Sequence, residues 1–157
     1  MPVHGLKITR HIALASDRPA VIFTTTVSNP GDQPQATRVK SHLELDLGDL
    51  AATTLAFETI GGESIEMDMQ PVIDELREGI MFHANFETLP AGEWTFSGSK
   101  GLQVTQEFDK ETVDLTWVYA YPEELQMLEV ELWRMEEPIP PGKSVTLRHE
   151  LEIQPVG

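Results

Sequence analysis

The stretch SHLELDLG (residues 41–48) decides the fold, because polar and apolar side chains alternate along it at every second position. Successive side chains of an extended strand point to opposite faces, so His42, Glu44 and Asp46 share one face. The leucines at 43, 45 and 47 line the other face. One apolar and one polar face predict a strand of an antiparallel sheet that is buried on one side and solvated on the other.

Similar runs occupy most of the chain. AVIFTTTVSN (20–29) is rich in β-branched residues, NPGDQP (29–34) is typical of a turn, and ATRVKSHLELDLGDL (36–50) alternates. We expect 20–29 and 36–50 to pair as antiparallel neighbours across that turn. TTLAFETIGGESIEMDM (53–69) predicts a hairpin about Gly61 and Gly62, and further strands are expected between 80 and 121 and over 145–153.

Two segments have helical features. PVIDELREGI (71–80) begins with proline, carries acids early and predicts one short helix. PEELQMLEVELWRMEE (122–137) fits a helix by spacing, but its turn-and-strand surroundings favour a strand. As a strand it would bury residues 128, 130 and 132 and turn Glu129, Glu131 and Trp133 outward. The fold class expected is all-β, an antiparallel β-sandwich with one short helix.

Composition limits the function classes. The 157 residues suit a single β-sandwich domain over 1–157, either complete or a module or half-domain of a larger protein. A net charge of −15 disfavours nucleic acid and anionic membranes as partners, and the absence of cysteine excludes disulfides and thiolate sites. We find no signal peptide or apolar span, which predicts a cytoplasmic protein if the chain is complete.

Two groups of residues could carry chemistry. His42 beside Glu44 and Asp46 could act as a general acid, or the row could be the solvated face of a strand. Glu129 and Glu131 with Trp133 could bind a sugar, since aromatic rings stack on pyranoses while acids bind hydroxyls; otherwise they are surface residues. The five histidines are not at paired ligand spacing, so neither a metal nor another cofactor is expected.

Two longer stretches resemble the β-sandwich of galactose mutarotases and their relatives, including sandwich domains of polysaccharide-degrading enzymes. TTTVSNPGDQPQATRVKSHLELDLG (24–48) has a strand ending in Asn, a turn, and a strand with an internal histidine before a glycine. LEVELWRMEEPIPPGKSVTLRHELEI (128–153) resembles the closing section of the family. The resemblance covers residues 6–50 and 90–154 and implies that His42 matches the catalytic acid and Glu129 the base.

The departures from that family are also specific. By this resemblance, the chain is expected to lack the earlier half of a mutarotase, which carries an Asn-Arg sugar clamp and another histidine. LELDLG follows His42 in place of the aromatic motif of the family. The resemblance therefore implies the architecture and a carbohydrate association rather than a working epimerase.

Three functions follow from these patterns. The preferred one is a non-catalytic sandwich module of a carbohydrate-active protein, which binds glycan or supports a neighbouring domain. The second is a reduced aldose-epimerase-like enzyme with His42 as acid and Glu129 as base, where Glu44, Glu131, Trp133 and Trp117 bind substrate. The third is a structural or protein-interaction sandwich, whose partner is another domain or a second copy.

Overall fold

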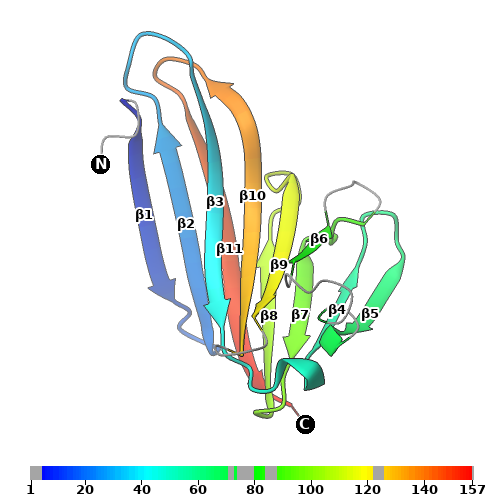
Figure 1. Ribbon diagram of the computed structural model, residues 1–157. Coiled ribbons are helices and arrows are strands. Elements are labelled where there is room, and N and C mark those ends of the chain that lie inside the picture. Colours follow the sequence, from blue (N-terminus) through cyan, green and yellow to red (C-terminus); the bar gives the residue numbers. More distant parts are fainter. Residues whose placement is uncertain (1–4, 71–72, 74–79, 84–87, 122–125, 157) are drawn as a thin grey trace.

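The computed structural model consists of two antiparallel sheets packed face to face (Figure 1) and describes residues 5–70, 73, 80–83, 88–121 and 126–156. The seven-stranded sheet has the order β1 (Lys7–Leu14), β2 (Ala20–Ser28), β11 (Ser144–Pro155), β8 (Leu102–Phe108), β7 (Glu93–Ser97), β4 (Thr54–Glu58), β5 (Ser64–Asp68). The four-stranded sheet has the order β3 (Gln35–Leu45), β10 (Met127–Ile139), β9 (Leu115–Tyr121), β6 (Ile80–His83). The predicted all-β sandwich is confirmed.

The core lies between the sheets, where the period-two alternation of each strand places its apolar side chains. On β10, Leu128, Val130 and Leu132 are at most 1% exposed. On the opposing sheet, Trp94 and Phe96 of β7 are fully buried. Burial of a large apolar side chain contributes about 1.5–3 kcal/mol, so these facing layers supply the main driving force for the sandwich.

The segment from 127 to 139 is a strand, as predicted, and the hairpin about Gly61 and Gly62 joins β4 to β5. The described residues include one helical element with defined bounds, the 3-10 turn η1 (Leu50–Ala52). The helix expected over 71–80 falls almost entirely outside the described residues, as do residues 122–125. No helix in the described ranges is long and apolar enough to cross a membrane.

The expected pairing of 20–29 with 36–50 is wrong, because β2 and β3 belong to different sheets. The turn after β2 carries the chain across the sandwich, and the turn after β10 does the same at the same end (Figure 1). Asn29, which is 1% exposed, joins the two turns. Its side-chain amide donates to the carbonyls of Gln33 and Ile139, each at 2.7 Å, so the two crossings stabilise each other.

A chain of polar side chains crosses the apolar core between the sheets. Trp94 Nε1 donates to Gln106 Oε1 at 2.6 Å, and Gln106 Nε2 lies 3.1 Å from His149 Nδ1. His149 Nε2 in turn lies 2.6 Å from Ser41 Oγ on β3. Burial, together with the positive charge of Arg10, lowers the pKa of His149 from 6.5 to about 4. The imidazole is therefore neutral at neutral pH and links the sheets through hydrogen bonds.

Candidate functional site

The antiparallel register of the four-stranded sheet brings together all the residues that the sequence analysis selected except Asp46. Glu131 on β10 lies directly opposite His42 on β3 and Trp117 on β9, and Glu129 lies opposite Glu44 and Tyr119. These side chains point away from the core, because their neighbours along each strand are the buried ones. We call this surface the His42 face; it comprises Lys40, His42, Glu44, Trp117, Tyr119, Tyr121, Glu129, Glu131 and Trp133.

Glu131 is the most buried member of the His42 face, at 2% exposed. Its Oε1 accepts hydrogen bonds from Lys40 Nζ at 2.5 Å and from His42 Nδ1 at 2.9 Å, and its Oε2 accepts one from Trp133 Nε1 at 2.8 Å. Burial raises the pKa of Glu131, but these three hydrogen bonds outweigh it and hold the pKa below the usual range. Glu131 is therefore an ionised carboxylate that orients three neighbouring side chains.

The two groups matched to an acid and a base converge on the same face. His42 Nε2 lies 3.5 Å from Glu129 Oε1, and the two side chains are 34% and 17% exposed. Because they are in contact, no sugar ring fits between them in this arrangement. Glu44, with a side chain that is 60% exposed, lies 3.7 Å from the same imidazole nitrogen.

Aromatic rings form the other part of the His42 face. The ring of Trp117 is 5.2 Å from that of Tyr119 and 6.1 Å from that of Trp133, and Lys40 Nζ lies 4.9 Å from the centre of the Trp133 ring. Trp117, Tyr119 and Trp133 are all half-buried, so each ring has an accessible portion. Indole and phenol rings held in this way present apolar surface beside carboxylates.

Tyr119 and Tyr121 belong to the His42 face although the sequence analysis did not select them, whereas Asp46, which it did select, lies outside the face. Tyr119 and Tyr121 share the face because they follow Trp117 at alternate positions in TWVYAY (116–121), a period-two signal that could have identified them. Burial, and then the negative charge of nearby carboxylates, raises the pKa of both phenols. Asp46 follows the end of β3 and pairs with Lys100 at 2.5 Å.

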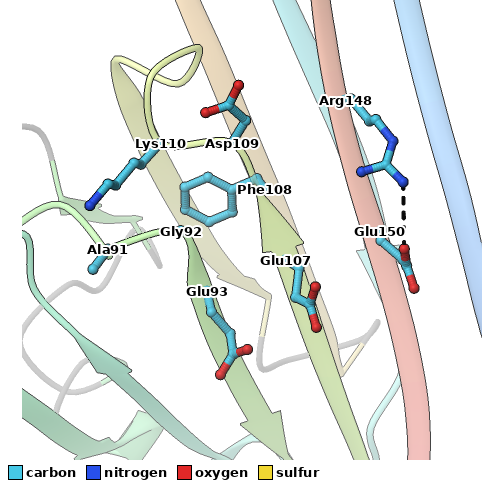
Figure 2. Close-up of a pocket in the computed structure, with 9 residues that line it drawn as sticks. All are labelled: Ala91, Gly92, Glu93, Glu107, Phe108, Asp109, Lys110, Arg148 and Glu150. Carbon is cyan, nitrogen blue, oxygen red and sulfur yellow. Dashed lines mark ion pairs between the residues drawn. The ribbon is translucent and has the colours of Figure 1, made fainter.

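A pocket lies on the outer surface of the seven-stranded sheet, away from the His42 face, and has different chemistry (Figure 2). This pocket of about 500 Å³ is lined by Ala91, Gly92, Glu93, Glu107, Phe108, Asp109, Lys110, Arg148 and Glu150. Glu107 lies opposite both Glu93 and Glu150 in the sheet, and Glu150 pairs with Arg18 and, at 3.8 Å, with Arg148. This pocket contains none of the site residues predicted from the sequence.

Comparison with solved structures places the sandwich in a known class. Slr1438 from Synechocystis sp. PCC 6803 superposes with a TM-score of 0.71 at 13% identity over 96% of this chain and 55% of its own. A galactose mutarotase-like protein from Lactobacillus casei superposes with a TM-score of 0.71 at 13% identity, over 95% of this chain and 63% of its own. A GalM/aldose epimerase homologue from C. elegans superposes with a TM-score of 0.69 at 14% identity, over 97% of this chain and 61% of its own. No protein-family model and no curated protein matches the sequence.

The chain therefore has a two-sheet antiparallel β-sandwich fold. More specifically, the fold is galactose mutarotase-like, which confirms the resemblance seen in the sequence. The chain spans between 55% and 63% of the length of these three structures. At these identities the likeness establishes the fold alone.

Proposed function

We propose that the His42 face binds carbohydrate and that the chain acts as a non-catalytic, sugar-binding sandwich module. The observation that carries this proposal is the hydrogen bond from Trp133 Nε1 to Glu131 at 2.8 Å. It fixes an aromatic ring beside a group of carboxylates. Apolar ring faces and hydroxyl-binding acids are the two elements that a pyranose requires.

The contact between His42 and Glu129 favours binding over catalysis. An acid and a base that act on opposite sides of a sugar ring must be separated by that ring, whereas these two groups lie 3.5 Å apart. His42 is also held on its other nitrogen by Glu131. A carbohydrate would bind over these side chains, with Glu44 and Glu129 accepting hydrogen bonds from hydroxyls and the indoles contacting the apolar face of the ring.

The fold of the solved relatives supports the same substrate class, because two of them are named for galactose mutarotase and aldose epimerase. Those names describe proteins much longer than this chain. The proposal therefore takes from them the class of ligand, an aldose or a glycan containing one, and takes the binding residues from the His42 face itself.

Ligand-observed NMR with saturation transfer tests the proposal on a panel of monosaccharides and oligosaccharides that includes galactose and glucose. Transfer to at least one sugar is expected for the wild-type chain, with a loss of tenfold or more in affinity for Trp133→Ala. Ile12→Ala is the matched control, since this exposed apolar residue lies on the other sheet. Equal transfer to Trp133→Ala and wild type, or none with any sugar, would refute the proposal.

A second candidate is an aldose-epimerase-like enzyme, which the convergence of His42 and Glu129 on one partly buried face favours. It requires the two side chains to move apart when sugar binds. Polarimetry of freshly dissolved α-galactose distinguishes the candidates. The non-catalytic module leaves the rate of anomer exchange at that of buffer, whereas an enzyme accelerates it and loses the acceleration in both His42→Ala and Glu129→Gln.

A further inference from the structure

The two nitrogens of His42 have different surroundings. Nδ1 lies 2.9 Å from Glu131 Oε1, an ordinary hydrogen-bond distance. Nε2 faces Glu129 at 3.5 Å and Glu44 at 3.7 Å, which are longer than hydrogen bonds between an imidazole and a carboxylate. The imidazole nitrogen therefore lies near both carboxylates without forming a short hydrogen bond to either.

The tautomer of His42 follows from its partner. Both oxygens of Glu131 already accept hydrogen bonds, from Lys40 Nζ and from Trp133 Nε1, so the proton of the contact with His42 lies on Nδ1. In the neutral imidazole this leaves the lone pair of Nε2 directed toward the side of Glu44 and Glu129. A lone pair beside two carboxylates is repulsive unless a positive group lies between them.

The spacing of the three groups suits a metal ion. One ligand atom from each of His42, Glu44 and Glu129 lies within 4.8 Å of the others. A tetrahedral ion bound at about 2.0–2.1 Å separates its ligand atoms by roughly 3.3–3.4 Å, close to the distances at Nε2. We propose that His42, Glu44 and Glu129 bind one divalent transition-metal ion of the zinc class, with Glu131 orienting the imidazole.

Local charge agrees with this assignment. The contacts described here join three carboxylates, those of Glu44, Glu129 and Glu131, to one ammonium group, that of Lys40. A neutral His42 leaves two uncompensated negative charges, which a divalent ion neutralises.

The arrangement around His42 also matches what metal-binding histidines require. Such a histidine commonly donates its second ring N–H to a carboxylate, which fixes the tautomer and the ring orientation. Glu131 provides this carboxylate and is itself held by Lys40 and Trp133. The ligands come from β3 and β10, far apart in the sequence but adjacent in the sheet, so their spacing along the chain does not reveal them.

The donor set determines the class of ion. An imidazole nitrogen with two carboxylate oxygens suits zinc and its neighbours, whereas calcium prefers about six to eight oxygen ligands. Three protein ligands leave a fourth tetrahedral position open to water or to a ligand hydroxyl. The assignment does not depend on the carbohydrate proposal, because metal binding is measured without any sugar.

Isothermal titration of zinc chloride into EDTA-treated, untagged protein tests the site, with cobalt as a spectroscopic probe. We expect one ion per chain and the intense visible absorption of tetrahedral cobalt. Glu44→Gln weakens zinc binding tenfold or more, and His42→Ala removes it. Glu131→Gln lowers the affinity by about 10–100-fold, as for other carboxylates that orient a metal-binding histidine.

Glu66→Gln is the control, since Glu66 is also an exposed strand glutamate but lies on β5 in the other sheet. It should bind zinc like the wild type. The site is refuted if the wild type binds no zinc, if Glu44→Gln binds as tightly as Glu66→Gln, or if calcium binds more tightly than zinc. Because Glu44 is exposed, its variant tests the site without disturbing the core.

Discussion

Acidification should destabilise this sandwich through His149, whose imidazole lies between the sheets at 2% exposed. In the folded chain its pKa is lowered from 6.5 to about 4, mainly by burial. Between these two pH values the unfolded chain binds more protons than the folded chain, so stability falls as the pH falls. The stability that the neutral, buried His149 contributes to the fold is fully present above about pH 6.5 and is lost progressively as the pH drops through 4.

The magnitude follows from the size of the pKa difference. Each pKa unit corresponds to about 1.4 kcal/mol, so the shift from 6.5 to about 4 corresponds to roughly 3 kcal/mol. Protonation of Nδ1 would also break its hydrogen bond with Gln106, because Gln106 Nε2 donates to that nitrogen. Protonation of His149 therefore weakens the chain of hydrogen bonds that joins the two sheets.

Urea unfolding followed by tryptophan fluorescence at several pH values between 7 and 4 measures this effect. The free energy of unfolding of His149→Gln should be lower than that of the wild type at pH 7, partly because the variant loses the ring stacked on Phe23 at 4.7 Å. The difference between the two proteins should shrink by about 3 kcal/mol toward pH 4. His11→Gln, an exposed histidine on β1, should follow the wild-type profile. A pH-independent difference would show that protonation of His149 does not destabilise the fold.

Three further changes test the packing and the hydrogen bonds by chemical denaturation. Leu128→Ala, at a fully buried site, should lower the free energy of unfolding by about 2–5 kcal/mol. Ile12→Ala, at a side chain that is 57% exposed, should change it by less than about 0.5 kcal/mol. Similar losses in the two variants would contradict the assignment of Leu128 to the core. Asn29→Ala should cost about 2 kcal/mol or more, because the buried carbonyl of Ile139 loses its donor, and an unchanged midpoint would show that the two crossings do not depend on Asn29. Glu131→Ala should cost about 1–3 kcal/mol and alter the indole N–H signal of Trp133 in NMR spectra, and an unaltered signal would exclude their hydrogen bond.

Local alternation was sufficient to predict the sandwich and part of the His42 face. His42 and Glu44 on β3, and Glu129 and Trp133 on β10, point outward because the alternate positions of each strand are apolar and face the core. The two segments are adjacent in the sheet, so their polar rows meet. Nothing in either segment indicates that pairing, since the residues are far apart in the sequence.

The errors and omissions have physical causes of the same kind. NPGDQP predicts a turn, but it does not indicate which sheet the next strand joins. In the structure, Asn29 in this turn donates a hydrogen bond to the carbonyl of Ile139, which is far away in the sequence. The sequence analysis selected Glu131 only as an outward residue, and nothing in its own strand indicated that the register would place it directly opposite His42. A position in the register is set by strand pairing, which sequence periodicity does not specify.

The sugar-binding role of the His42 face is tested most directly by the three indole N–H signals in a ¹⁵N-labelled sample titrated with galactose, glucose and their oligosaccharides. Trp117 and Trp133 lie on that face, and Trp94, fully buried and bonded to Gln106, serves as an internal control. If the His42 face binds sugar, the Trp117 and Trp133 signals shift with added sugar while the Trp94 signal stays in place. If neither signal moves with any sugar in the panel, the His42 face does not bind carbohydrate.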